Sequence, residues 1–396
     1  MTSTTVTIGS HQVLTGPAAS GLNEIAPAAK AYFDYVNARG GVNGRKILYE
    51  YLDDAYTPAN TPALVRKLVE RDQVFAVFNG EGTADHSAVV GYLTAHKVPD
   101  LFPASGCVCW NQPSTLPYTF GWQMDYIREG KILGAYVEKA FPGKRIAYFY
   151  QDDGYGQQGV QGLERVIPAS SVVARQTYKA GYNDVSAQML AINRSRADVI
   201  ISFSVPAYTA LLRLAQRRTG NTAKLVVSFA GGDPVTLARL LPSQPGGGGA
   251  DAGVFDGVVT DTWLVPVSQA ASGWVALLKE VRDQYLSGQP LDAWTEYGVA
   301  AAYTFVQALQ RAGRNLTRPS LLTAVAQGGF SPGFGLTPFD YSPTSHGGYT
   351  GTQIATIRDG AYVLQRRPVT TDDGSGPVVP YTGPAVPPGP GGVPRP

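Results

Sequence analysis

The sequence lacks an excess of charge of either sign. In 396 residues, 32 Lys and Arg stand against 30 Asp and Glu, which gives a net charge of +2. Proteins that bind nucleic acid or anionic membranes through their surface charge carry a basic excess, and no long basic run is present here. The charge balance therefore argues against a nucleic-acid partner.

Long apolar runs are absent as well. No run reaches the ~18 residues that a membrane-spanning helix needs, and a content of 44% hydrophobic and 16% charged residues is typical of a soluble globular protein. The first residues, Met1–Val6, show no basic region, apolar stretch or cleavage site of a signal peptide. We expect either a cytosolic protein or the mature form of an exported one.

Cysteine and histidine are scarce. The cysteines are Cys107 and Cys109, and the four histidines lie elsewhere, so no set of zinc ligands with the usual spacing is present. A bridge between the two cysteines would close a very small ring, and two small, partly buried thiols fit the sequence equally well. The sequence predicts no metal site and leaves the state of the thiols open.

Motifs for catalysis and nucleotide binding are missing. No Gly-x-Ser-x-Gly stands at a strand-to-helix turn. The glycine-rich stretch 244–250 lacks the Lys-Ser/Thr pair of a phosphate-binding loop and is interpreted as a flexible surface loop. Gly80 and Gly82 match the first two glycines of the dinucleotide-binding pattern Gly-x-Gly-x-x-Gly. Asp85 occupies the position of its third glycine, so the pattern is incomplete. We therefore expect neither an enzyme nor a cofactor.

The sequence does contain a regular alternation of strands and helices. It opens with a strand at 6–13, a turn of small residues at 14–21, a helix at 23–37 that stops before Gly41, and a second strand at 46–52. These segments form one β-α-β unit. Because the turn after the first strand is built of small residues, a ligand can approach its backbone closely.

The alternation continues and predicts the fold class. A helix is predicted at 83–96 and a hairpin at 351–365 around Asp359 and Gly360. Further strands are predicted at 73–78, 98–103, 145–150, 171–178, 198–204, 224–229 and 257–264. Repeated β-α alternation indicates an α/β protein with mostly parallel sheets and helices on both faces. The length favours two lobes over one.

The end of the chain has a different composition. Residues 370–396 are rich in Pro and Gly, with Pro-Pro-Gly-Pro at 387–390. Such a segment cannot bury a core of its own, so we predict an extended or disordered tail.

Short motifs in the first β-α-β unit carry a resemblance to a known family. They are Leu14-Thr-Gly-Pro17, Asn37-Ala-Arg-Gly-Gly41 followed by Asn43-Gly44, and Asp53-Asp54. In order and spacing, they resemble the branched-chain amino-acid and amide class of solute-binding proteins of ABC importers. The resemblance covers about residues 5–368. It implies an extracytoplasmic protein of the type I periplasmic-binding-protein fold, whose signal segment is absent from this chain.

The resemblance also implies a domain organisation. Two doubly wound parallel-sheet lobes would be joined by a three-segment hinge and would close over a ligand. The expected crossings lie near 119–124, 255–261 and 334–341. The expected parts are an N-terminal lobe (1–121 plus 258–335), a C-terminal lobe (122–257 plus 336–367) and a flexible tail (368–396).

Ligands of open α/β sheets lie beyond the carboxyl ends of strands, where helices begin. The loop 79–84 offers Thr83 as a helix N-cap with free backbone N–H groups nearby, which suit a carboxylate. An ordinary capped turn would look the same. The resemblance implies that Gly82 and Thr83 bind the ligand. Glu81 is either a carboxylate partner for a ligand ammonium or a solvated loop charge.

The loop 103–107 is the second candidate. The resemblance implies that Ala104 offers a backbone carbonyl and Ser105 a hydroxyl, while the Gly106 amide adds a donor. Trp110 follows and is either a wall of the pocket or a packing residue.

The expected second lobe contributes three further candidates. The resemblance implies that Tyr155 covers the ligand with its ring, and that loops containing Ser204 and Ala230 lie beside it. Amino-acid binders often carry a carboxylate near position 230 for the ligand ammonium, but here Asp233 is displaced and is expected to cap a helix. This departure favours acids or amides over standard α-amino acids.

The function implied by the resemblance is capture of a small amino acid, amide, or keto or aromatic acid, followed by delivery to the permease subunits of an ABC importer. The alternative is a cytosolic sensor of the same fold that controls a regulator. His11 is expected either to look into the cleft or to face its neighbours in the strand, and His86 could face inward.

Overall fold

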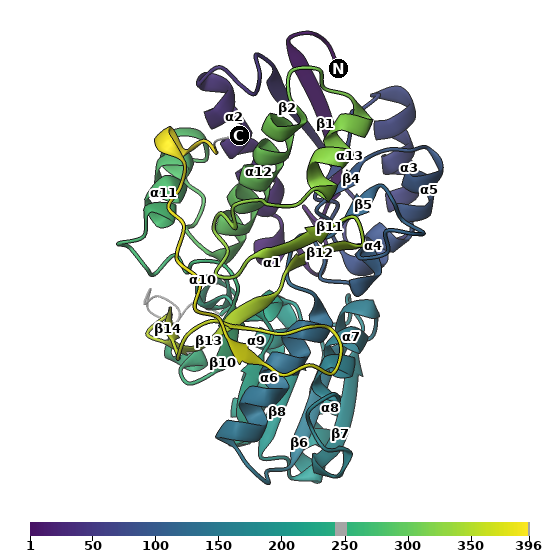
Figure 1. The fold of residues 1–396 in the computed structure, drawn as a ribbon. Coiled ribbons are helices and arrows are strands. Elements are labelled where there is room, and N and C mark those ends of the chain that lie inside the picture. The colour runs from purple at the N-terminus through teal and green to yellow at the C-terminus, as the bar shows by residue number, and fades with distance from the viewer. Residues whose placement is uncertain (242–251, 395–396) are drawn as a thin grey trace. The chain divides into compact units, whose positions relative to one another are not determined.

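The computed structural model describes residues 1–241 and 252–394, so the predicted glycine-rich loop at 244–250 lies outside the described part. The chain forms two compact units, each assembled from separate segments (Figure 1). Unit 1 comprises Met1–Asp125, Gln269–Thr350 and the segment from Gly383 onward. Unit 2 comprises Tyr126–Ser268 and Gly351–Thr382.

Unit 1 is built on a parallel sheet with the strand order β2-β1-β3-β4-β5. Its strands are β1 (Thr5–Gln12), β2 (Lys46–Asp53), β3 (Val77–Phe78), β4 (Asp100–Leu101) and β5 (Thr119–Phe120), with a separate hairpin of β11 (Phe339–Ser342) and β12 (Ser345–Tyr349). Its helices are α1 (Ala19–Leu22), α2 (Ile25–Ala38), α3 (Thr61–Arg66), α4 (Thr83–Ser87), α5 (Val90–Ala95), α11 (Gly273–Tyr285), α12 (Ala293–Ala312) and α13 (Arg318–Ala326). The predicted β-α-β opening is thus present.

The core of unit 1 lies where α2 and α12 meet the sheet. Phe33 of α2, Phe78 of β3 and Phe305 of α12 form an aromatic cluster with ring centroids 4.9–6.0 Å apart. Aromatic side chains bury large apolar areas and prefer such edge contacts. Gly298 lets the two helices approach closely, since a Cβ there would clash with the carbonyl oxygen of Ile25.

Unit 2 has a sheet of order β16-β15-β13-β10-β9-β8-β6-β7, with β14 beside β13. Strands β6 to β10 pair in parallel, and the later ones pair antiparallel. The strands are β6 (Ile146–Gln151), β7 (Val172–Tyr178), β8 (Val199–Phe203), β9 (Lys224–Val227), β10 (Val259–Thr262), β13 (Gly351–Arg358), β14 (Ala361–Leu364), β15 (Val369–Thr370) and β16 (Val379–Pro380). The helices are α6 (Tyr126–Ala140), α7 (Gly154–Leu163), α8 (Ser186–Ser195), α9 (Pro206–Arg218) and α10 (Pro234–Arg239).

Several predicted elements differ in length. The strand predicted at 73–78 is only β3, and the one predicted at 98–103 is only β4. The single helix predicted at 83–96 is divided into α4 and α5, because Val89 between them has a non-helical φ of −126°. The hairpin predicted at 351–365 is confirmed as β13 and β14, with positive φ angles at Asp359 and Gly360 in its turn.

The tail was predicted to be extended or disordered, and in the structure it is extended with two short strands. Strands β15 and β16 extend the sheet of unit 2, while the last described residues lie against unit 1 (yellow end in Figure 1). There the carbonyl oxygens of Val386, Gly391 and Gly392 accept hydrogen bonds from Trp274, Tyr35 and Tyr32. A segment that cannot build a core can still order by docking on helices that already have one.

Because the end of the chain belongs to unit 1, the polypeptide crosses between the units once more than expected. The chain passes from one unit to the other after Asp125, Ser268, Thr350 and Thr382, so there are four passages where three were expected. The first three lie downstream of the crossings expected near 119–124, 255–261 and 334–341.

Candidate functional site

The two loops predicted to bind a ligand in unit 1 lie side by side. They follow β3 and β4, which are neighbours in a parallel sheet, and Glu81 and Ala104 form a further bridge beyond the strands. The Gly82 N–H donates to the Ala104 carbonyl at 3.3 Å, and the Ala104 N–H donates to the Gly80 carbonyl at 2.8 Å. Backbone pairing therefore continues past both strand ends and fixes the position of the loops.

The loops bring together the hydroxyls of Thr83 and Ser105, whose oxygens are 2.7 Å apart and buried. The N-cap position belongs to Gly82 and not to Thr83, because Thr83 is already the first helical residue of α4. Gly82 has a φ of +93°, which favours glycine. Ser105 is held by the Trp110 indole N–H, which donates to its carbonyl at 3.1 Å. Gly106 is buried in the same loop.

Cys107 and Cys109 form a disulfide, which answers the question that the sequence left open. The bridge lies between Ser105 and Trp110. Trp110 in turn packs edge-on against His86, with ring centroids 4.9 Å apart. The loop that carries Ser105 is thus constrained both covalently and by packing.

Glu81 is not a solvated loop charge. Its side chain is fully buried, its Oε2 accepts the Val13 N–H at 3.0 Å, and its Oε1 has no hydrogen-bond partner in the described part of the chain. Burial raises the pKa of this carboxyl well above its usual range, and the nearby Asp54 and Asp85 raise it further. Glu81 therefore places a carboxyl oxygen without a protein partner in the loop predicted to bind the ligand.

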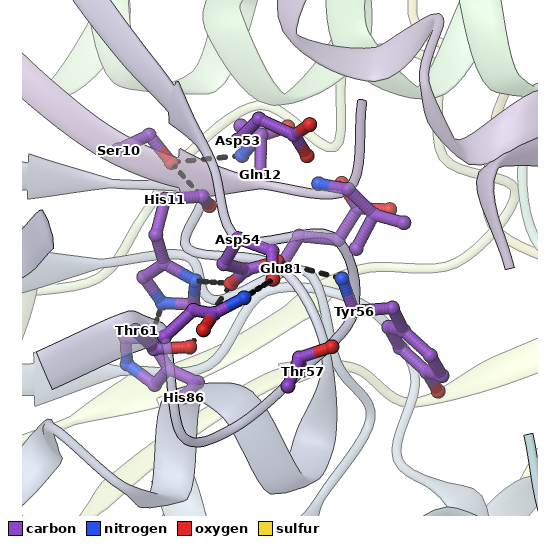
Figure 2. A network of polar contacts seen from close by, with 12 residues as sticks. Ser10, His11, Gln12, Asp53, Asp54, Tyr56, Thr57, Thr61, Glu81 and His86 are labelled. Atoms are coloured by element: carbon purple, nitrogen blue, oxygen red, sulfur yellow. Dashed lines mark hydrogen bonds and ion pairs between the residues drawn. The ribbon is translucent and has the colours of Figure 1, made fainter. Parts of the chain in front are cut away.

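Next to this loop lies a hydrogen-bonded network of four buried ionisable side chains, and Figure 2 shows three of them, Asp54, His11 and His86. Asp54 Oδ2 is 2.8 Å from His11 Nδ1, His11 Nε2 is 2.9 Å from His86 Nδ1, and His86 Nε2 is 2.8 Å from Asp100 Oδ2. All four side chains are fully buried. Thr61 and Thr119 donate their hydroxyls to the outer carboxylates at 3.1 and 2.8 Å. The four residues come from β1, α4, β4 and the end of β2, so their hydrogen bonds connect these elements.

The number of protons in this network follows from its hydrogen bonds. Each of its three links needs one hydrogen, whereas two neutral imidazoles supply only two. The third is held either as an imidazolium or as a carboxylic acid. Burial lowers the pKa of His11, and its hydrogen bond to Asp54 opposes that effect.

Gly80 connects this network to the loop predicted to bind the ligand. A Cβ at Gly80 would stand 2.5 Å from His86 Nδ1 and 2.6 Å from His11 Nε2, so only glycine lets the loop cross the histidine pair. The Glu81 N–H also donates to the His11 carbonyl at 3.1 Å. His11 therefore faces its neighbours in the fold, and its ring supports the loop that carries Glu81 to Thr83.

Unit 2 also brings its predicted residues together. The Tyr155 hydroxyl lies 2.7 Å from Ser228 Oγ and donates to the Ser204 carbonyl at 3.3 Å. Ala230 lies in the short 3-10 helix Phe229–Gly231 that follows Ser228. These loops follow β6, β8 and β9. The tyrosine hydroxyl is already engaged, and burial raises its pKa. The Tyr155 ring packs against Tyr126 and Phe203, with centroids 4.8 and 5.9 Å away.

Asp233 accepts the Thr236 N–H at 2.7 Å and caps α10, as expected. Another buried carboxyl pair, which sequence reasoning missed, lies nearby. Glu129 Oε1 accepts the Phe229 N–H at 2.7 Å. A hydrogen bond with Glu129 lowers the pKa of Asp261, but burial is the larger effect. Burial raises the pKa of Asp261 to about 7. The two acids stabilise the base of the loop that contains Ala230.

Comparison with known proteins places the chain in a family. The family model described as periplasmic binding protein matches residues 5–361. The chain belongs to this family. Among curated relatives, the Leu/Ile/Val-binding protein BraC3 of Rhizobium johnstonii is 24% identical over 336 residues, which is 82% of this chain and 84% of the relative.

Solved structures show the same fold. A branched-chain amino-acid ABC transporter protein from Thermus thermophilus with bound valine has a TM-score of 0.81 at 20% identity, covering 93% of this chain and 97% of that one. A fatty acid ABC transporter substrate-binding protein from Thermomonospora curvata has a TM-score of 0.81 at 21% identity, covering 96% and 97%. The chain therefore has the type I periplasmic-binding-protein fold.

The family gives the protein a solute-binding role, and its relatives are binding proteins rather than enzymes. Within residues 1–241 and 252–394, no group of three or more His, Cys, Asp or Glu side chains could hold a metal ion. None of the helices in the described ranges is both long and apolar enough to cross a membrane.

Proposed function

We propose that this protein captures a small amino acid or its amide outside the cytoplasm and delivers it to the permease of an ABC importer. The solute engages Gly82, Thr83, Ala104, Ser105 and Gly106 of unit 1. The observation that carries this proposal is the pairing of the Thr83 and Ser105 hydroxyls in two loops beyond neighbouring parallel strands.

The chemistry of unit 1 suits a solute with a carboxyl or amide group. The Thr83 and Ser105 hydroxyls each have one donor and two acceptor sites, so the pair can turn toward a ligand oxygen without losing its mutual contact.

Glu81 favours a solute that also carries an amine. Its Oε1 is buried and has no hydrogen-bond partner among residues 1–241 and 252–394, and an ammonium group would satisfy it and favour its ionised form. The sequence favoured acids or amides because no carboxylate stood near Ala230, but a buried carboxyl at Glu81 offers an alternative. The names of the relative and of the valine-bound structure support an amino acid as the solute.

The disulfide supports an extracytoplasmic location. Bridges between cysteines persist in oxidising compartments and are rare in the cytosol. This observation favours the importer over the cytosolic sensor.

Calorimetric titration of the full chain with amino acids, their amides and the matching 2-keto acids tests the proposal. We expect an amino acid to bind, and Thr83→Val and Ser105→Ala each to weaken binding about 10-fold, as for a lost hydrogen bond to a charged group. Ser114→Ala is the matched control, since Ser114 is exposed. Glu81→Gln should weaken the amino acid more than its keto acid. Equal affinity of wild type and both hydroxyl variants for every bound solute would refute the site.

A further inference from the structure

Unit 2 contains a cavity of about 500 Å³ whose lining includes no residue of the loops described above. One wall is a face of α6, formed by Ile132, Ala135, Tyr136 and Lys139 at the helical spacing i, i+3, i+4, i+7. Ile354 of β13 forms a second wall. The volume is within the ~300–1,000 Å³ of typical small-molecule sites.

The third wall comes from the end of the chain. Gln365, Arg366 and Arg367 follow β14, and Val369, Val378 and Pro380 belong to the β15–β16 segment. All six residues of this wall lie beyond residue 361, where the match to the family model ends. The segment is fixed against α6, because Arg128 donates to the Thr371 carbonyl at 3.0 Å and Lys131 pairs with Asp372 at 2.8 Å. The tail thus adds a wall to a helix face that would otherwise be open.

The lining divides into an apolar body and a basic edge. Ile132, Ala135, Ile354, Val369, Val378 and Pro380 offer no side-chain hydrogen bonds, whereas Lys139, Arg366 and Arg367 bring three positive charges to the same cavity. None of these three cations forms an ion pair within the described ranges, and no Asp or Glu lines the cavity. A zwitterionic amino acid would therefore find no carboxylate partner for its ammonium among the lining residues.

The basic edge is partly positioned by the fold. The Arg366 carbonyl accepts a hydrogen bond from Gln353, and Arg366 itself adopts a positive φ of 57°. The Tyr136 hydroxyl donates to Gln365 Oε1 at 3.4 Å, which joins α6 to the segment that carries both arginines. Arginine pairs readily with carboxylates in a bidentate way.

We propose that this cavity is a second binding site, which takes a medium-chain carboxylic acid with its hydrocarbon body against α6 and its carboxylate at Arg366 and Arg367. The site is independent of the proposed amino-acid site, since it shares no residue with it and selects for an anion without an ammonium group.

Titration of the full chain with decanoate, kept below its aggregation concentration, tests this proposal. We expect saturable binding of decanoate and at least tenfold weaker binding of 1-decanol, because the uncharged head loses the charge-assisted hydrogen bonds. Equal affinity for both compounds, or no saturable binding of decanoate at millimolar concentration, would overturn the proposal.

Three variants locate the bound acid. Arg366→Gln with Arg367→Gln should weaken decanoate on the order of tenfold, and Ala135→Trp should abolish binding by filling the cavity. The matched control is Arg165→Gln with Arg194→Gln, which removes the same charge from exposed positions of unit 2 outside the cavity and should leave the affinity unchanged. An equal loss in this control would show a nonspecific charge effect and reject the site.

Two further titrations separate this site from the proposed amino-acid site. Thr83→Val should keep its decanoate affinity while it loses amino-acid affinity. If Thr83→Val lost decanoate instead, the acid would occupy the first site, and the second-site proposal would fail while solute capture stood. Decanoate binding that persists in Thr83→Val and disappears in Ala135→Trp would support the second site, even if no amino acid bound.

Discussion

His11 Nε2 and His86 Nδ1 lie 2.9 Å apart in the buried interior of unit 1, with an aspartate on the far side of each ring. The rings are stacked, with centroids 5.2 Å apart and an angle of 18° between their planes. The pair stands directly beneath Gly80, and its hydrogen-bonded chain ends at Thr61 and Thr119. The arrangement therefore joins the loop predicted to bind the ligand to the ends of three strands.

Gly80→Ala tests the close approach of the loop to the histidine pair. The new methyl group would stand 2.5 Å from one ring and 2.6 Å from the other, and both rings are fixed by buried hydrogen bonds. We expect a loss of about 1–3 kcal/mol in unfolding free energy, as for an overpacked core, measured by urea denaturation. Gly91→Ala in α5 is the control, because its Cβ meets nothing within 4 Å and should be neutral or stabilising. Equal effects of the two substitutions would contradict the geometry.

Asp54→Asn tests the buried hydrogen-bonded network of Asp54, His11, His86 and Asp100. Asp54 Oδ2 receives both His11 and Thr61, while its Oδ1 accepts the Tyr56 N–H at 3.0 Å. An amide nitrogen cannot accept the hydrogens that one of these oxygens accepts, so a buried group loses its partner. We expect unfolding free energy to fall by about 2–4 kcal/mol. Asp283→Asn, which changes a largely exposed carboxylate, should cost under about 1 kcal/mol. A comparable loss in both variants would argue against a special role for Asp54.

The architecture could be predicted from the sequence, whereas the buried histidine–aspartate network could not. Alternating strand and helix patterns predict parallel sheets, and the loops of Thr83 and Ser105 are expected to meet because neighbouring parallel strands end at one edge. His11, Asp54, His86 and Asp100 stand far apart in sequence, and their pairing depends on strand register and on the helix rotation after Gly82. No local pattern encodes those two quantities.

The burial of individual side chains was also not predictable from the sequence. Glu81 is in a glycine-flanked loop, where a carboxylate is usually solvated, yet the continued pairing of Glu81 with Ala104 encloses it. The tail shows the converse. Its composition predicts no core of its own, but Tyr32, Tyr35 and Trp274 supply donors for its carbonyl groups, and those donors lie far away in sequence.

The acid pair of unit 2 predicts a pH dependence of stability. The pKa of Asp261 is raised from 3.8 to about 7 in the fold, so the folded state holds a proton that the unfolded state releases between these values. Stability from this group is therefore present at low pH and is lost as pH rises toward 7, by at most about 1.4 kcal/mol per pH unit. The raised pKa of Glu81 acts in the same direction.

Asp261→Asn should flatten this dependence. From pH 5 to pH 8, the unfolding free energy of the variant should gain about 1–3 kcal/mol relative to wild type, measured by urea denaturation at each pH. Asp283→Asn should follow the wild-type curve throughout. A variant that runs parallel to wild type would show that Asp261 does not hold the proton.

The Cys107–Cys109 disulfide should affect solute affinity more than global stability. It closes a very small ring, and chain-entropy arguments give such a ring only about 1–2 kcal/mol of unfolding free energy. The ring nevertheless spans the stretch between Ser105 and Trp110, and the Cys109 N–H donates to Cys107 Sγ at 3.3 Å. We expect Cys107→Ser with Cys109→Ser to shift the urea midpoint slightly but to weaken solute binding several-fold by loosening Ser105, as calorimetry would measure. Reductant should reproduce this loss in wild type and have no effect on the double variant. An unchanged affinity in both experiments would mean that Trp110 packing alone orders the loop.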